Sequence, residues 1–228
     1  MSSDLAARLS AIDESIADAA RRAGRDAAEI TRIVVTKFHP ASLVRDLYAL
    51  GVRDVGENRQ QELSAKVEEL GALPELRWHF IGQAQTKKAG AIRRAADTVH
   101  SVDRTRVADA LDRAGEGMAP LDVLLQINLT DDPARGGAAP AEIEALTEHV
   151  LGCSTLRLRG VMAVAPLDEE PAKAFARLHG YAERVRGIAP DASWISAGMT
   201  GDFAEAIAAG ATHLRIGSAI TGPRPAQG

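Results

Sequence analysis

One lysine of this chain occupies a position where an amine can do chemistry. Lys37 directly follows the apolar run Ile33-Val34-Val35-Thr36 and shares a strand face with Ile33 and Val35. A lysine buried at a strand end loses part of its preference for the charged form, and its neutral amine can form an imine with an aldehyde or ketone. The alternative is a lysine that extends its charged end into solvent. The other lysines lie in polar helical contexts where a solvated ammonium is expected: Lys66, Lys87, Lys88 and Lys173.

Two glycine-containing segments near the C-terminus have the composition of a phosphate site. Gly198-Met199-Thr200-Gly201-Asp202 follows one apolar run, and Arg215-Ile216-Gly217-Ser218 ends the last one. Glycines let backbone N–H groups approach an anion, and the hydroxyls of Thr200 and Ser218 can donate to it. The alternative is that Gly201 only makes a turn and Asp202 only caps a helix.

Arg215 is expected to point into the protein interior, because it shares a strand face with His213 and Gly217. An unpaired charge there is costly, so we expect a dedicated partner, either an internal acid or a ligand.

Three further side chains are candidates for contact with a ligand. Asn58 can present its amide to a ring oxygen, and the sulfur of Met162 can pack against a flat ring. His79 lies in the middle of a run, where a hydrogen-bonded core histidine is the alternative. Glu57 and Arg59 beside Asn58 are equally consistent with an ion pair on the rim.

The elements that must position these residues are short apolar runs that alternate with helical patterns. Most runs are continuous rather than alternating, which is typical of strands covered on both faces. About eight βα units predict a parallel sheet, either open or closed, and their number and the 228-residue length favour a closed (β/α)8 TIM barrel. The expected strands are Ile33–Lys37, Val52–Glu57, Trp78–Gly82, Thr98–Val102, Val123–Leu129, Leu158–Val164, Trp194–Ala197 and His213–Gly217.

An extra helix is expected before the first strand. Leu5, Leu9, Ile12 and Ile16 follow one another at helical spacing. Because regular βα units continue on both sides of the loop 130–140, residues 1–228 are expected to form one domain.

Composition and missing motifs exclude several classes of function. The net charge is −4 with no basic cluster, which disfavours nucleic-acid and anionic-membrane partners. No secretory signal and no membrane-spanning run are recognised. The dinucleotide fingerprint, the P-loop and HExxH are absent, and the six histidines and Cys153 show no metal-ligand spacing, so no metal is expected. The lone cysteine predicts a cytoplasmic protein, and the lack of an apolar surface stripe favours a monomer.

An imine-forming lysine that faces a phosphate site and an inward arginine suggests a phosphorylated aldehyde as ligand. Pyridoxal 5′-phosphate is the cofactor with that chemistry. At these residues the chain resembles the pyridoxal phosphate homeostasis protein family, relatives of the N-terminal barrel of alanine racemase. The resemblance covers nearly the whole chain, and its segments are 34–40 (VVTKFHP), 56–62 (GENRQQE), 78–85 (WHFIGQAQ), 100–103 (HSVD), 158–162 (LRGVM), 198–202 (GMTGD) and 215–222 (RIGSAITG).

The resemblance implies a single (β/α)8 barrel that holds pyridoxal phosphate as a Schiff base on Lys37. It places the phosphate near Thr200, Gly217 and Ser218, and Arg215 against the pyridine nitrogen. It also implies a protein that stores, buffers or delivers the cofactor without a catalytic reaction, with pyridoxal-phosphate-dependent apoenzymes as candidate recipients. Among its departures from the family, the lysine that is usual in the loop after the fifth strand either appears here as Arg135 or is lost, so a second ligand site in that loop is not expected to be kept.

Two enzymatic alternatives remain at this point. A racemase of low activity shares the lineage, but such racemases use a second domain and a partner subunit to supply the opposing acid or base. Only a short segment follows Gly217 here, so no such domain is expected. A Schiff-base aldolase rests on fold analogy alone.

Overall fold

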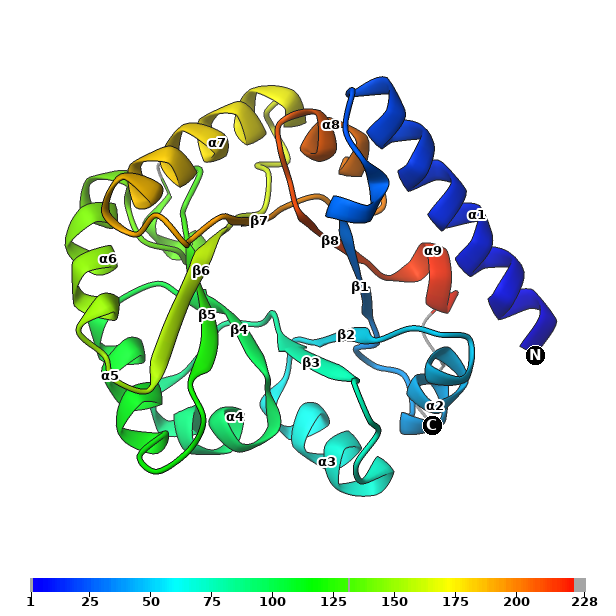
Figure 1. The fold of residues 1–228 in the computed structure, drawn as a ribbon, viewed down its shortest axis with the longest axis horizontal. Coiled ribbons are helices and arrows are strands. Elements are labelled where there is room, and N and C mark those ends of the chain that lie inside the picture. Colours follow the sequence, from blue (N-terminus) through cyan, green and yellow to red (C-terminus); the bar gives the residue numbers. More distant parts are fainter. Residues whose placement is uncertain (1, 131, 224–228) are drawn as a thin grey trace.

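The computed structural model describes residues 2–130 and 132–223, and its core is a closed barrel of parallel strands (Figure 1). Each strand pairs with the next along the chain, and β8 pairs with β1 to close the ring. The expected (β/α)8 barrel is therefore confirmed. The strands are β1 (Thr31–Val35), β2 (Asp54–Glu57), β3 (Arg77–Phe80), β4 (Thr98–Val102), β5 (Leu121–Gln126), β6 (Leu156–Met162), β7 (Trp194–Ser196) and β8 (His213–Ile216).

Helices surround the barrel and cover the outward faces of the strands (Figure 1). All residues of β2, β4 and β8 are buried, because one face meets the helices and the other fills the interior. The helices are α1 (Ser2–Arg22), α2 (Ala41–Ala49), α3 (Gln60–Leu70), α4 (Ala89–Ala95), α5 (Thr105–Ala114), α6 (Ile143–Leu151), α7 (Pro171–Ile188), α8 (Phe203–Ala208) and α9 (Ser218–Thr221).

The expected helix before the first strand is α1, and it completes the outer layer. The helix that follows β8, α9, has one turn only, so it cannot cover the barrel there. In Figure 1, α1 lies beside α8 and α9 at this place, and it buries Leu5, Leu9 and Ile16. Arg8 donates from Nε to the carbonyl of Ile220 at 2.7 Å, which ties α1 to α9.

Several strands end earlier than their apolar runs. β1 ends at Val35 rather than Lys37, β5 at Gln126 rather than Leu129, and β6 at Met162 rather than Val164. In the loop after β5 the apolar residues stay buried, since Ile127 and Leu129 are 2% and 8% exposed, whereas Val164 beyond β6 is 48% exposed. Apolar residues therefore continue past the last strand pairing whether or not they are buried.

Gly82 is required by a close approach of two backbones, and we expect its replacement to destabilise the barrel. A Cβ on Gly82 would lie 1.9 Å from the carbonyl oxygen of Asn58, so Gly82→Ala forces the backbone to move. The expected loss in the free energy of unfolding is about 2 kcal/mol, as for other overpacked sites. Gly180 on α7 has no atom within 4 Å of such a Cβ, so Gly180→Ala is the matched control. Denaturant unfolding should show Gly180→Ala stabilised by about 0.5–1 kcal/mol, and equal stability of the two variants would contradict the account.

Candidate functional site

Lys37 lies in a tight turn at the carboxyl-end rim, two residues beyond the end of β1. The turn runs from Thr36 to His39, with a hydrogen bond from the His39 amide to the Thr36 carbonyl at 3.1 Å. Lys37 is only partly buried, so the expected placement as a buried strand residue is wrong.

Phe38 follows Lys37 in a strained backbone conformation, with φ at +68°. A bulky side chain rarely adopts this left-handed region, so the surrounding structure must hold it there. Glu62 on α3 does so, because its Oε2 accepts from the Phe38 amide at 2.9 Å. Strain held beside a candidate functional lysine is consistent with a turn shaped for a site.

A buried ion pair fixes the start of the same turn. Lys66 on α3 donates to the Thr36 carbonyl at 2.8 Å and pairs with Glu57 at the end of β2. Glu57 also accepts from the Thr36 hydroxyl at 2.6 Å. Burial raises the pKa of Glu57 above its usual value, and the nearby Lys66 cation opposes this shift. The ammonium of Lys66 is buried and paired, so the expectation of a solvated lysine is wrong.

The alternative of a rim ion pair between Glu57 and Arg59 is also wrong. Arg59 pairs with Glu62 at 3.6 Å, and its guanidinium lies 5.0 Å from the centre of the Phe38 ring. Arg59 therefore covers the turn from outside, while Glu57 holds it from inside.

Residues of the two glycine-containing segments line the same cavity as Lys37. In the first, the Asp202 carboxylate accepts from the Met199 amide at 2.6 Å. Asp202 also precedes α8, and Gly198 has φ at +90°, which allows the turn. In the second segment, Ser218 begins α9, and the amides of Ile220 and Thr221 donate to the Gly217 carbonyl at 2.9 and 3.0 Å. The amides at this helix start that remain for an anion are those of Ser218 and Ala219.

Arg215 is buried in the barrel interior, as expected from the alternation along β8. Its two described hydrogen bonds go to neutral oxygens, the Ser196 hydroxyl at 2.7 Å and the Ala163 carbonyl at 2.8 Å. Burial lowers the pKa of Arg215 to about 10, which leaves the guanidinium charged at neutral pH. No carboxylate among residues 2–130 and 132–223 forms an ion pair with Arg215.

Residues of the three segments line one cavity of about 350 Å³ at the rim. The candidates that the structure brings together there are Lys37, Thr200, Arg215, Gly217 and Ser218. Phe38, His39 and Ile81 also line this cavity, and sequence analysis did not single them out. The motif around Lys37 contains Phe38 and His39, so the turn itself is the signal that was available for both.

Three candidates lie outside that lining. Asn58 follows β2 and has a buried Oδ1 without a hydrogen-bond partner. His79 is buried inside the barrel on β3 and contacts Asp54 and His100. Met162 is buried at the end of β6, paired in register with Ser196 of β7.

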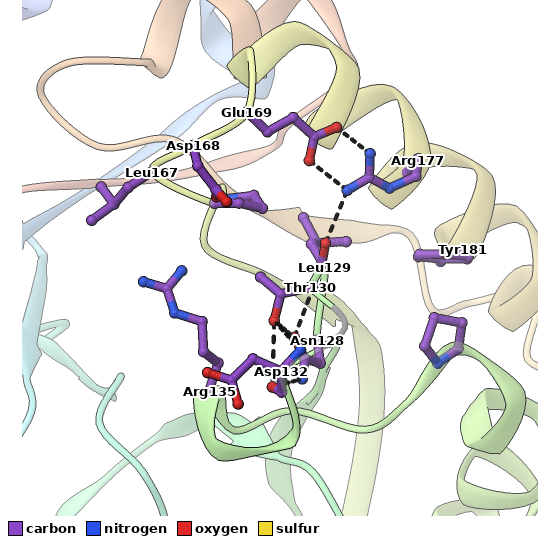
Figure 2. A pocket seen from close by; sticks show the side chains of 12 residues that line it. Asn128, Leu129, Thr130, Asp132, Arg135, Leu167, Asp168, Glu169, Arg177 and Tyr181 are labelled. Atoms are coloured by element: carbon purple, nitrogen blue, oxygen red, sulfur yellow. Dashed lines mark hydrogen bonds and ion pairs between the residues drawn. The ribbon is translucent and has the colours of Figure 1, made fainter.

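A second cavity of about 900 Å³ lies on the rim between the loops that follow β5 and β6 (Figure 2). Arg177 on α7 pairs with Glu169 and donates to the Leu129 carbonyl at 2.9 Å. Arg135 stands across the hollow from this pair, with Asp168 between them in Figure 2. The lining carries acidic and basic side chains together, unlike the smaller cavity.

His213, below Arg215 on β8, makes the stability of the fold depend on pH. Burial lowers its pKa from 6.5 to about 3, whereas in the unfolded chain it ionises normally. The unfolded state therefore binds one more proton between these values, and the free energy of unfolding falls by up to about 1.4 kcal/mol per pH unit as the pH drops. Urea unfolding between about pH 7 and pH 4 should show a smaller slope in His213→Asn than in the wild type. Equal slopes in the two proteins would contradict this assignment.

One cluster elsewhere brings together residue types that can bind a metal, although no metal-ligand spacing was recognised in the sequence. Asp109, His149 and Cys153 bring ligand-type atoms within 4.8 Å of one another. The His149 Nε2 and the Asp109 carboxylate lie 2.6 Å apart and link α6 to α5. Burial and the nearby Asp112 and Asp109 raise the pKa of the Cys153 thiol to about 11, which keeps it protonated. The cluster therefore acts as a contact between helices.

Comparison with known proteins extends these observations. The family model described as alanine racemase, N-terminal domain, matches residues 8–225. A pyridoxal phosphate homeostasis protein of Mycobacterium tuberculosis is 41% identical over 97% of this chain and 93% of its own length. One of Escherichia coli is 38% identical over 97% of each chain. The structure of PipY of Synechococcus elongatus with pyridoxal phosphate bound has a TM-score of 0.82 and 34% identity over 95% of this chain and 99% of its own.

In the part of the chain that the structure describes, no helix combines the length and apolar character needed to cross a bilayer.

Proposed function

The chain belongs to the pyridoxal phosphate homeostasis proteins, a family built on the alanine racemase N-terminal domain, and we propose that it holds pyridoxal 5′-phosphate in the cavity between Lys37 and Ser218. In this role it stores, buffers or delivers the cofactor and carries out no catalytic reaction of its own. Its curated relatives are named for homeostasis of the cofactor, which supports the proposal.

The charge of the cavity is the observation that carries this function. Lys37 and Arg215 both line it, and no Asp or Glu is found among the described residues of the lining. A cationic cavity in a chain of net charge −4 is selective for an anionic ligand. Its volume of about 350 Å³ lies within the range of small-molecule sites, roughly 300–1,000 Å³. The residues present therefore fit a small phosphorylated compound.

Lys37 and the two glycine-containing segments would bind different parts of the cofactor, its aldehyde and its phosphate. When bound, the cofactor would supply an aldehyde, a group that condenses with a primary amine with loss of one water. Lys37 would offer that amine from the cavity lining. The hydroxyls of Thr200 and Ser218 and the amides around Gly217 would donate hydrogen bonds to the phosphate.

Arg215 contributes charge at the inner end of the cavity. We propose that its guanidinium faces the pyridine nitrogen and keeps that nitrogen unprotonated. This placement weakens the ring as an electron acceptor, so it favours a carrier over a catalyst. Contacts of Asn58, His79 and Met162 with the cofactor remain predictions.

The second candidate function is a racemase of low activity, and one side chain favours it. Racemisation needs an acid or base in addition to the lysine, and His39 lines the cavity beside Lys37. Burial and the Lys66 cation lower the pKa of His39, which keeps its ring neutral. Exchange of the Cα hydrogen of an amino acid with solvent deuterium, above the rate with free cofactor, would support this function. No exchange across a panel of amino acids would remove it.

We propose a monomer in the cytoplasm that gives its cofactor to pyridoxal-phosphate-dependent apoenzymes. The buried, protonated Cys153 is compatible with a reducing compartment.

Binding of three related compounds tests the proposed function. Equilibrium dialysis should retain about one equivalent of pyridoxal phosphate. Pyridoxal, which lacks the phosphate, and pyridoxine 5′-phosphate, which lacks the aldehyde, should each bind at least about tenfold more weakly, a difference of ~1.4 kcal/mol. Retention of no pyridoxal phosphate, or equal affinity for all three compounds, would contradict the proposal.

A further inference from the structure

A chain of buried hydrogen bonds runs through the barrel interior and ends at Arg215. The His79 Nε2 lies 2.9 Å from the Asp54 carboxylate, and the His79 Nδ1 lies 2.9 Å from the His100 Nε2. The His100 Nδ1 lies 2.9 Å from the Ser196 hydroxyl, which accepts from Arg215 at 2.7 Å. All five residues are buried, and they come from β2, β3, β4, β7 and β8.

The other end of this series of hydrogen bonds is an ion pair, and it lies at the end of the barrel where the strands begin. Asp54 begins β2, and its second carboxylate oxygen accepts from Arg77 at 2.7 Å. Burial opposes ionisation of Asp54, but its hydrogen bonds with His79 and Arg77 outweigh this, so its pKa lies below the usual value. The series of hydrogen bonds therefore has the ionised carboxylate of Asp54 at one end and the charged guanidinium of Arg215, which lines the cavity, at the other.

The chemistry of these two ends constrains the bonds between them. A guanidinium only donates and a carboxylate only accepts, so Ser196 accepts from Arg215 and the His79 Nε2 donates to Asp54. The pKa of His100 lies well below its usual value, mainly because the ring is fully buried, and the nearby Arg215 guanidinium acts in the same direction. A neutral His100 has one N–H, which serves either His79 or Ser196.

We propose that every bond of the chain points the same way, from Arg215 through Ser196, His100 and His79 to Asp54. His100 and His79 then carry their single proton on Nε2, and each accepts on Nδ1. The Ser196 hydroxyl gives its hydrogen to His100, so its lone pairs are left for Arg215. Bonds aligned in one direction polarise and strengthen one another.

This alignment makes Asp54, His79, His100 and Ser196 positioning residues for Arg215. Neither partner of Arg215 is charged, so its orientation depends on a hydroxyl that is itself held by His100. A guanidinium fixed in this way directs its charge at the inner end of the cavity, where the ligand ring would lie. The inference rests on the proposed function for its effect on the cofactor, whereas the proton positions belong to the protein alone.

Nitrogen-15 NMR of the full-length, histidine-labelled protein tests the proton positions without cofactor. His79→Gln and His100→Gln assign two of the six histidine signals. At neutral pH, both rings are expected in the neutral form with the proton on Nε2. A His100 protonated on Nδ1, or a doubly protonated His79, would overturn the direction of the chain.

Two substitutions of His100 test the effect on binding. Glutamine offers an acceptor oxygen and a donor NH2 group, so it can replace the acceptor and the donor of the neutral ring, whereas leucine offers neither. His100→Leu is expected to weaken pyridoxal phosphate binding by about tenfold or more and to shift the absorbance maximum of the bound cofactor. His100→Gln should restore both, and Leu178→Ala, a buried change on α7, should leave both at their wild-type values.

The outcomes separate the two hypotheses. If the wild type does not bind pyridoxal phosphate, the proposed function fails, but the proton positions are still decided by NMR. If the wild type binds and a folded His100→Leu binds with unchanged affinity and absorbance, the positioning role fails. If His100→Leu does not fold, the NMR result for the wild type decides the inference.

Discussion

Lys37→Ala is expected to abolish the visible absorbance of the loaded protein, because Lys37 supplies the amine that holds the cofactor covalently. The phosphate segments remain intact in this variant, so residual binding should persist. We expect that binding to be weaker by at least about 100-fold, which corresponds to ~2.7 kcal/mol. Absorbance titration together with equilibrium dialysis measures both effects.

Two controls separate this role of Lys37 from a loss of charge. Lys37→Arg keeps a cation but has no amine that can condense with the aldehyde, so it should also lack the band. Lys173→Ala removes an exposed lysine on α7 that pairs with Glu170 at 3.2 Å, and it should keep the full band. Full absorbance in Lys37→Ala would refute the assignment of the site.

Breaking the buried pair between Glu57 and Lys66 is expected to have the largest effect on stability. Each single substitution leaves a buried group without its partner, so Glu57→Gln and Lys66→Met should each lower the free energy of unfolding by about 3–5 kcal/mol. The double variant removes both charges together, and it should lose less than the sum of the two. Denaturant unfolding of the wild type, the two single variants and the double variant measures the coupling energy between Glu57 and Lys66.

The pH dependence of Lys66→Met provides an independent check. In the wild type, burial raises the pKa of Glu57 and the Lys66 cation opposes this, so loss of the cation raises the pKa further. Protonation then neutralises Glu57 more easily in the folded state, and the cost of Lys66→Met should shrink as the pH falls. Additive effects of the two substitutions on stability, or a destabilisation by Lys66→Met that does not depend on pH, would contradict the proposed role of the Glu57–Lys66 pair in holding the turn at Lys37.

The barrel could be predicted from the sequence because its signal is local and repeated. Runs such as Leu121–Gln126 and Leu156–Met162 are mostly buried, and eight such runs alternate with helical patterns. The same pattern could not locate the strand ends, since apolar residues continue into the loops that follow the strands. The apolar spacing also predicted the helix α1. It did not indicate that α9 has only one turn and leaves part of the barrel for α1 to cover.

Parts of the candidate site could be predicted for the same reason. Lys37, Thr200, Arg215, Gly217 and Ser218 each follow or end an apolar run, and parallel strands bring such positions to one rim. The alternation along β8 also indicated that Arg215 points inward.

The interactions that hold this site could not be predicted from local patterns. Lys66 lies in the polar segment of α3, and only the packing of α3 on β2 shows that it is buried against Glu57. The partners of His79 are likewise 21 and 25 residues away along the chain. Whether a polar side chain is buried depends on a partner from another element, which spacing along one element does not reveal.

Reduction of the loaded protein with borohydride, followed by intact mass and peptide mapping, tests the central claim most directly. The reduction turns a carbon–nitrogen double bond between lysine and cofactor into a stable single bond. We expect one phosphopyridoxyl group per chain, on the peptide that contains Lys37. No adduct after incubation with pyridoxal phosphate, or an adduct on another lysine, would contradict the account.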